Sequence, residues 1–177
     1  MRYPGILKIE FPAQNYQQIL MSVLTIFCKI WGGRTESQFV PTAGTVTAYF
    51  NGDILLSNIR PYLKKIWLAD NDGGSSGDVL VLKPDNSVIL SQYLFYQLAA
   101  DEFFDYEMQH VKGQKMPRAD KSEVLNYLVY VPSIEIQQST LNKIREIHDE
   151  ITAQNGQLQE LTLQKDDILK KYLSSVP

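Results

Sequence analysis

Two short clusters of basic residues stand out in this chain of 177 residues, although its formal net charge is −3. They consist of Arg60, Lys64 and Lys65 in the first cluster and of Lys112, Lys115 and Arg118 in the second. Lysine and arginine bind phosphate and also hydrogen-bond to base edges in the major groove. Two local clusters on an acidic chain favour a focused DNA contact over general coating of nucleic acid. Two solvated surface faces are the alternative interpretation.

Short hydrogen-bonding side chains accompany both clusters. Ser57 and Asn58 stand at the end of an expected strand, where phosphate and base-edge contacts are common, and Gln114 can read adenine. The glycine-rich segment 70–78 lacks the lysine of a P-loop and precedes an expected strand, so we interpret it as a hairpin loop that reaches DNA. The candidate DNA-binding residues are Ser57, Asn58, Arg60, Lys64, Lys65, Ser75, Ser76, Lys112, Gln114, Lys115 and Arg118.

The residue sets of enzymes that act on DNA do not occur in the sequence. An adenine methyltransferase needs Asn or Asp before two prolines and an aromatic residue, and residues 58–62 match this pattern only superficially. Pro84-Asp85 is not followed by the acid and lysine that would complete the magnesium site of a common restriction nuclease. His110 and His148 lie far apart in the sequence with no obvious nucleophile. The sequence therefore predicts no catalytic residue, no metal site and no cofactor.

Segments typical of strands alternate with turns from residue 44 to residue 82. Residues 45–50 are rich in β-branched and aromatic side chains, Asn51-Gly52 is a strong turn signal, and residues 53–56 begin another strand, so a hairpin is expected. Residues 66–69 and 79–82 are expected to form a second strand pair.

Prolines are expected to fix the loops that carry the basic clusters. Arg60 precedes Pro61, and a residue before proline is biased towards extended conformations, so its guanidinium should project from a rigid turn. The loop 113–118 has a flexible entry at Gly113 and a restrained position at Pro117.

Helical segments follow the strands. Ser91 can cap a helix over residues 92–108, and Asp120 can cap a short helix over residues 121–125. Strand-rich sequence followed by packing helices predicts a mixed α/β (α+β) sheet-and-helix domain, which we place at residues 1–133.

Residues 134–177 contain no proline before the terminal Pro177 and are predicted to form a long helix with a coiled-coil seam. The heptad positions are apolar except at Lys165 and Gln154. The apolar members are Ile144, Ile147, Ile151, Leu158, Leu161, Ile168 and Tyr172. A helix of about 36 residues would be ~54 Å long, so much of its apolar stripe needs a partner. A lone amphipathic helix packed on its own domain is the alternative.

The apolar run 19–28 is about half the ~20 residues that a bilayer requires, so we interpret it as a buried helix or strand and expect no membrane segment. Cys28 is the only cysteine, which favours a reducing cytoplasm and excludes a disulfide within the chain.

Three blocks follow one another in a fixed order: GDILLSNIRPYL at residues 52–63, GQKMPR at residues 113–118, and the proline-to-helix junction PSIEIQ at residues 132–137. Together they resemble a target recognition domain from the specificity subunit of a type I restriction-modification system. Such subunits generally carry two recognition domains, each followed by a long helix, whereas this chain has room for one of each. It therefore resembles a half-length specificity subunit or a fragment of one.

The resemblance implies a non-catalytic, sequence-specific DNA-binding subunit that reads one half of a bipartite double-stranded target. Its partners would be a methyltransferase subunit, which methylates adenine with S-adenosylmethionine, and a restriction motor subunit, which uses ATP to cleave unmodified DNA. A specificity protein should vary at its base-reading positions, so Arg60 and Arg118 would be phosphate clamps or structural anchors. The base readers would then lie in loops such as 32–42 and 70–78.

The helix from residue 134 would dock the methyltransferase and pair with a second copy of the chain. Antiparallel pairing would give the dimer a two-fold axis and an interrupted palindrome as its target. The runner-up interpretation is an assembly adaptor whose globular part binds protein, and a short nuclease or methylase ranks third.

Overall fold

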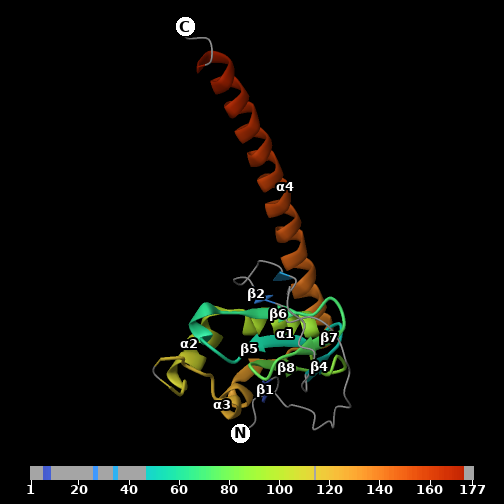
Figure 1. The fold of residues 1–177 in the computed structure, drawn as a ribbon. Helices are drawn as coiled ribbons and strands as arrows, with labels where there is room; N and C mark the ends of the chain where they lie inside the picture. The colour runs from blue at the N-terminus through green and yellow to red at the C-terminus, as the bar shows by residue number, and fades with distance from the viewer. Residues whose placement is uncertain (1–5, 9–25, 28–33, 36–46, 114, 174–177) are drawn as a thin grey trace. The chain divides into compact units, whose positions relative to one another are not determined.

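The computed structural model describes residues 6–8, 26–27, 34–35, 47–113 and 115–173, and the chain divides into two compact units, Met1–Gln137 and Gln138–Pro177 (Figure 1). The architecture is mixed α/β, with antiparallel sheets and a long C-terminal helix, as predicted. Its elements are β1 (Ile6–Lys8), β2 (Ile26–Phe27), β3 (Arg34–Thr35), β4 (Thr47–Tyr49), β5 (Ile54–Ser57), the 3-10 helix η1 (Pro61–Leu63), β6 (Ile66–Leu68), β7 (Gly73–Ser75), β8 (Val79–Leu82), α1 (Ser91–Leu98), α2 (Asp101–Gln109), α3 (Lys121–Asn126), β9 (Leu128–Tyr130) and α4 (Ile134–Leu173).

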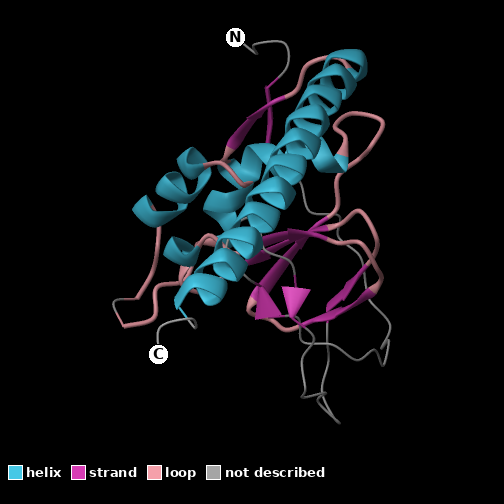
Figure 2. Cartoon of the chain, turned by 90° about the horizontal axis from the view of Figure 1, so that it is seen from above, coloured by secondary structure: helices cyan, strands magenta, loops and turns pink. Residues whose placement is uncertain are grey.

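A three-stranded antiparallel sheet with the order β6-β5-β8 forms the centre of the first unit (Figure 1). Alternate side chains of a strand point to opposite faces, so this sheet buries two sets of residues. Ile54 and Leu56 of β5 face α1, α2 and α3, which lie together beside the sheet in Figure 2. Leu55, between them, packs with Tyr49 and Ala69 on the other face. Both faces of β5 are therefore covered, and every residue of the strand is buried.

The strand segments are largely as predicted, but both predicted pairings are wrong. β4 pairs with β7 and not with β5. β6 and β8 do not pair with each other, because β5 lies between them and pairs with both. The Asn51-Gly52 turn does form, since the Asp53 amide donates to the Phe50 carbonyl at 2.9 Å and Gly52 has a φ of 90°. The turn leads the chain from β4 into the central sheet, because the apolar residues 54–56 of β5 are most stable at the centre of that sheet.

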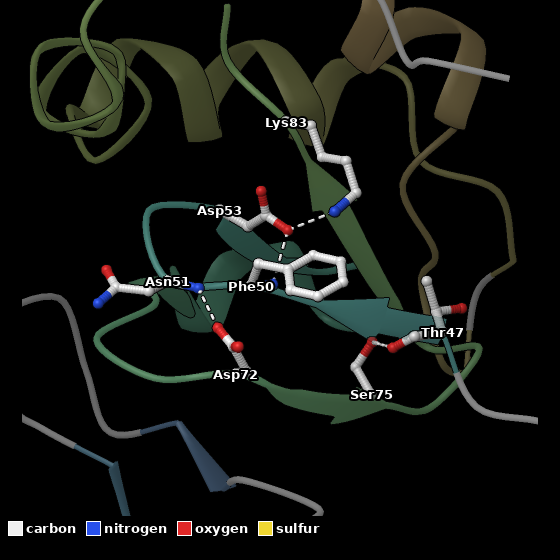
Figure 3. A network of polar contacts seen from close by, with 7 residues as sticks. All are labelled: Thr47, Phe50, Asn51, Asp53, Asp72, Ser75 and Lys83. Atoms are coloured by element: carbon white, nitrogen blue, oxygen red, sulfur yellow. Dashed lines mark hydrogen bonds and ion pairs between the residues drawn. The ribbon is translucent and has the colours of Figure 1, made fainter. Parts of the chain in front are cut away.

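Side-chain contacts fix the β4–β7 pair and the turn beside it (Figure 3). Asp53 accepts hydrogen bonds from the Phe50 amide at 2.9 Å and from Lys83 Nζ at 2.6 Å, and the same ammonium lies 4.6 Å from the centre of the Phe50 ring. Asp72 accepts from the Asn51 amide at 2.8 Å. The segment 70–78, expected to be a hairpin loop, thus contains a strand of its own and is tied to the turn after β4.

The predicted helix over residues 92–108 is wrong in its length, because it is divided into α1 and α2 at Ala99 and Ala100. In an unbroken helix Phe103 would lie about 140° around the axis from Leu98. The break allows both residues to be fully buried in the same core. Ser91 does not cap the first helix: Leu90 is the N-cap, and the Ser91 amide donates to Asn86 Oδ1 at 2.8 Å.

The short helix after residue 120 forms as predicted, and the Asp120 carboxylate accepts from the Ser122 amide at 3.0 Å as its cap. Helix α4 begins at Ile134, at the predicted junction. Gln137 in its first turn is fully buried, accepts from the Leu90 amide at 2.8 Å, and donates to the carbonyls of Val88 and Pro132 at 3.1 and 2.9 Å. These bonds attach the start of α4 to the first unit.

The second unit is the remainder of α4, in which every residue from Arg145 to Leu173 is exposed. Ile144 of the predicted seam is half-buried, and the other apolar seam residues are between 50% and 69% exposed. The helix is thus 40 residues long and carries an uncovered apolar stripe. The predicted apolar segment 19–28 lies outside the described residues except for β2.

Candidate nucleic-acid interface

The two sequence blocks that carry the basic clusters lie side by side. The Arg60 amide donates to the Pro117 carbonyl at 2.8 Å, and the Ala119 amide donates to the Asn58 carbonyl at 2.9 Å. Ile59 and Arg118 form an isolated antiparallel bridge between these two bonds. Residues almost sixty positions apart in the sequence therefore share one backbone framework, which we call the paired-loop surface: residues 58–65 together with residues 112–118.

The first loop of this surface turns sharply around η1. Arg60 has a φ of 51° and Lys64 has a φ of 49°, so both ends of η1 adopt the left-handed conformation. The prediction that Arg60 is extended is wrong. Its left-handed backbone lets its amide reach Pro117 while its carbonyl accepts from the Leu63 amide at 2.9 Å. Such non-glycine conformations cost about 1–3 kcal/mol each, and neighbouring contacts must hold them.

The second loop is closed at its base by two backbone hydrogen bonds of 2.9 Å between Lys112 and Arg118. Gly113 has a φ of 88°, a value that suits glycine, and this allows the chain to leave the base of the loop. Lys115 and Met116 are exposed beyond this base. Gln114 lies outside the described residues.

Carboxylates pair with half of the basic side chains on the surface. Asp78 accepts from Arg118 at 2.6 Å, Asp120 contacts Lys112 at 2.5 Å, and Asp101 at the start of α2 pairs with Lys64. In the part of the chain that the structure describes, the other three cations form no ion pair. They are Arg60, Lys65 and Lys115.

The ion pair between Lys112 and Asp120 at the base of the second loop shifts the pKa of both groups. The hydrogen bond from Lys112, together with those from the Ser122 hydroxyl and amide, lowers the pKa of Asp120 to about 2. The same bond raises the pKa of Lys112 above its ordinary value. Both groups are therefore charged throughout the physiological range.

The polar side chains nominated beside the clusters occupy more enclosed positions. Ser57 and Asn58 are buried, and the Ser57 hydroxyl donates to the Ile59 carbonyl at 3.0 Å. Asn58 Oδ1 is buried without a hydrogen-bond partner among the described residues. Ser75 is buried in β7 and donates to the Thr47 carbonyl at 3.3 Å (Figure 3), so its hydroxyl is used within its own sheet. Ser76 Oγ accepts from the Asp78 amide at 3.3 Å.

Two exposed apolar side chains on the paired-loop surface were not nominated from the sequence. Tyr62 in η1 is 51% exposed, and Met116 at the tip of the second loop is 46% exposed. Each lies within two positions of a candidate basic residue, and this proximity in the sequence could have identified both as part of the surface. The pairing acids could not be assigned in this way, because Asp78 and Asp101 come from other parts of the sequence.

No three His, Cys, Asp or Glu side chains of the described residues converge to hold a metal ion. None of the helices described is sufficiently long and apolar to cross a membrane.

No family model matches the chain, but two curated proteins do. It is 26% identical over 121 residues to the type I restriction enzyme EcoDI specificity subunit of Escherichia coli, a match that covers 66% of this chain and 27% of that protein. It is 29% identical over 105 residues to the HindI specificity subunit of Haemophilus influenzae, a match that covers 56% of this chain and 23% of that protein. The matched region is thus about a quarter of the length of either relative.

Solved structures share the fold. The HsdS subunit from Thermoanaerobacter tengcongensis superposes with a TM-score of 0.62 at 18% identity, over 89% of this chain and 44% of that one. A chain from a structure that addresses complex assembly and conformational transition of the type I R-M system gives a TM-score of 0.64 at 17% identity, over 97% and 49%. In sequence and in fold, the chain is therefore similar to the specificity subunits of type I restriction-modification systems, as its motifs predicted.

Proposed function

We propose that this chain is a DNA recognition subunit of a type I restriction-modification complex that reads one half of a bipartite target. The observation that carries the proposal is the paired-loop surface, where backbone hydrogen bonds unite the two basic blocks on a fold shared with HsdS. It gathers six cations from a chain whose net charge is −3, which is the arrangement that a focused phosphate contact requires.

The six cations of this surface differ in whether a carboxylate already pairs with them. Arg60 and Lys65 lie in the loop around η1, and Lys115 lies beyond the base of the second loop. Among the described residues these three form no ion pair, so a phosphate contact would displace no carboxylate. Arg118 and Lys112 exchange a carboxylate for a phosphate. Their contacts place the domain on the duplex, while base reading belongs to neighbouring segments such as 70–78, which contains Ser76, and to Gln114.

The second part of the proposal concerns α4. Its uncovered apolar stripe is long enough to engage a helix of a methyltransferase subunit, a second copy of this chain, or both. The methyl transfer and the ATP-dependent cleavage are then reactions of the partner subunits, and this chain directs them to their DNA.

Measured salt dependence tests the DNA contact. The logarithm of the apparent association constant of the full chain for duplex DNA should fall linearly with the logarithm of the salt concentration. Lys115→Ala and Arg118→Ala each remove one positive charge from the surface, so each should reduce that slope by about 0.9 and weaken binding. Fluorescence anisotropy with a labelled duplex measures both quantities. Lys143→Ala, an exposed lysine of α4, is the matched control and should leave the slope unchanged.

Equal slopes for wild type, Lys115→Ala and Arg118→Ala would remove the paired-loop surface from the DNA contact. The uncovered stripe of α4 favours one rival function, an assembly adaptor whose globular unit binds protein. That function predicts no DNA binding at any salt concentration together with stable capture of a methyltransferase.

A further inference from the structure

The three carboxylates that pair with the paired-loop surface come from three separate elements. Asp78 lies between β7 and β8, Asp101 begins α2, and Asp120 caps α3. Each contacts a different cation: Arg118, Lys64 and Lys112 respectively. The inference drawn from this arrangement rests on the proposed DNA contact and adds a role for the acids.

The ion pairs are not required by the fold of the loops. Arg118 and Asp78 are 49% and 44% exposed, and exposed pairs of this kind contribute only about 0–1 kcal/mol to stability. The loops are held instead by backbone bonds: the Asn58 amide donates to the Asp78 carbonyl at 2.8 Å, and the Arg60 amide donates to Pro117. Neither bond uses a carboxylate, so the pairing of these acids with the cations is available for another purpose, and Asp120 in addition caps α3.

That purpose follows from the charge balance. Six cations and three paired acids leave the surface with about half of the positive charge that its lysines and arginines carry. Sequence-independent affinity for DNA depends on this net charge, because each neutralised phosphate releases about 0.9 counterion. Contacts to base edges do not depend on it in this way. Lower net charge therefore weakens binding to random duplex DNA, where phosphate contacts alone supply the affinity.

We propose that Asp78, Asp101 and Asp120 are specificity-determining residues that act as built-in counterions. They compete with DNA phosphate for Arg118, Lys64 and Lys112, and they keep binding to random DNA weak. On a target sequence the domain lies closer to the duplex, and a DNA phosphate replaces the carboxylate as the partner of each of these cations.

Isosteric neutralisation of the acids tests the proposal in the full chain. Asp78→Asn, Asp101→Asn and Asp120→Asn should each raise affinity for a random-sequence duplex about fivefold near physiological salt, as expected for one unit charge removed at contact distance in water. Each should also steepen the salt slope by about 0.9, and the triple variant by about 2.7. Asparagine is itself a good N-cap, so Asp120→Asn retains the start of α3.

The controls separate local from global charge. Glu146→Gln, Asp149→Asn and Asp167→Asn change the net charge of the chain by the same amount on exposed positions of α4, and they should leave the slope near that of the wild type. Asp78→Glu retains the negative charge and should behave like the wild type. A purely structural role for Asp78 would instead lower the melting temperature of Asp78→Asn and leave the slope unchanged.

Two results are decisive in different ways. If Arg118→Ala lowers the slope but neutralising the three acids does not raise it above the α4 control, the counterion role is refuted and the DNA contact stands. If neither the wild type nor the triple variant binds DNA at low salt, the proposed function itself fails, and the counterion role fails with it.

Discussion

Glu107 shows at the scale of one residue how burial changes the chemistry of this domain. It lies on the inner side of α2, is 2% exposed, and neither of its carboxyl oxygens has a hydrogen-bond partner among the described residues. Burial raises its pKa from 4.5 to about 8. The carboxyl is therefore mostly protonated at neutral pH, since a neutral acid is far less costly to bury than a carboxylate.

This shift makes stability depend on pH. Below pH 4.5 the group is protonated in both the folded and the unfolded chain, so it adds no pH dependence there. Between pH 4.5 and 8 only the folded chain retains the proton, and the free energy of unfolding falls as pH rises. Glu107→Gln removes the ionisation. The free energy of unfolding of the variant minus that of the wild type should increase by roughly 2–4 kcal/mol from pH 5 to pH 9, because only the wild type loses stability through this group.

Urea denaturation at both pH values measures this difference. Glu146→Gln, an exposed position on α4, should show a difference from wild type that does not change with pH. A constant difference for Glu107→Gln as well would mean that Glu107 is already ionised in the folded domain at neutral pH.

At the scale of the element, β4 and β7 depend on a contact that only glycine permits. A β-carbon built on Gly73 would lie 2.4 Å from the Tyr49 hydroxyl oxygen and 2.5 Å from its ring carbon Cζ. Tyr49 is buried and packs edge-to-face against Trp67 with ring centres 5.6 Å apart, so it has little room to move. The pair therefore forms only because β7 carries no side chain at this position.

Gly73→Ala should consequently destabilise the domain by about 1–3 kcal/mol through overpacking. Chemical denaturation of the full chain measures this loss, and Gly77→Ala is the control, since nothing described lies within 4 Å of its added β-carbon. Adding Tyr49→Phe to Gly73→Ala should recover part of the loss by removing the hydroxyl that clashes. Equal stability of Gly73→Ala and wild type would show that β4 and β7 separate easily.

The same elements show what local sequence can and cannot predict. The strands β4, β5, β6 and β8, the Asn51-Gly52 turn, the Asp120 cap and the start of α4 follow from a few adjacent residues, and they were predicted correctly. The pairing of β4 with β7 depends on Gly73 meeting Tyr49, which are distant in the sequence. The left-handed Arg60 likewise depends on Pro117, so pre-proline statistics alone gave the wrong conformation.

The candidate site follows the same division. All six cations are recognisable from composition and spacing, because lysine and arginine carry their charge in any fold. Their partners Asp78 and Asp101 were not recognised, since ion pairing between elements is a property of the folded chain. The burial of Ser75 was missed for the same reason: it requires the unforeseen strand β7.

At the scale of the whole molecule, α4 carries a stripe of exposed apolar side chains at heptad spacing. Ile151 is 50% exposed and Leu158 is 62% exposed, one heptad apart. We expect the purified chain to associate through this stripe, because burial of apolar heptad positions stabilises helix pairing. Sedimentation equilibrium should show a dimer whose dissociation constant rises by at least tenfold in Ile151→Lys/Leu158→Lys.

Asp149→Lys/Gln159→Lys adds charge to the same helix away from the seam and serves as the control. Circular dichroism should show that both double variants retain the folded domain. A monomeric wild type at high concentration would contradict the dimer and leave the proposed methyltransferase subunit as the partner of the stripe.

The backbone bonds between residues 58–60 and 117–119 have a consequence for divergence under selection. An amide and a carbonyl are present at these positions whichever side chains the residues carry, proline at a donor position excepted. Mutations at the exposed positions can therefore exchange one side chain for another while both loops keep their course. Under the proposed function, a single substitution at such an exposed position would change the recognised DNA sequence while both loops keep their backbone hydrogen bonds.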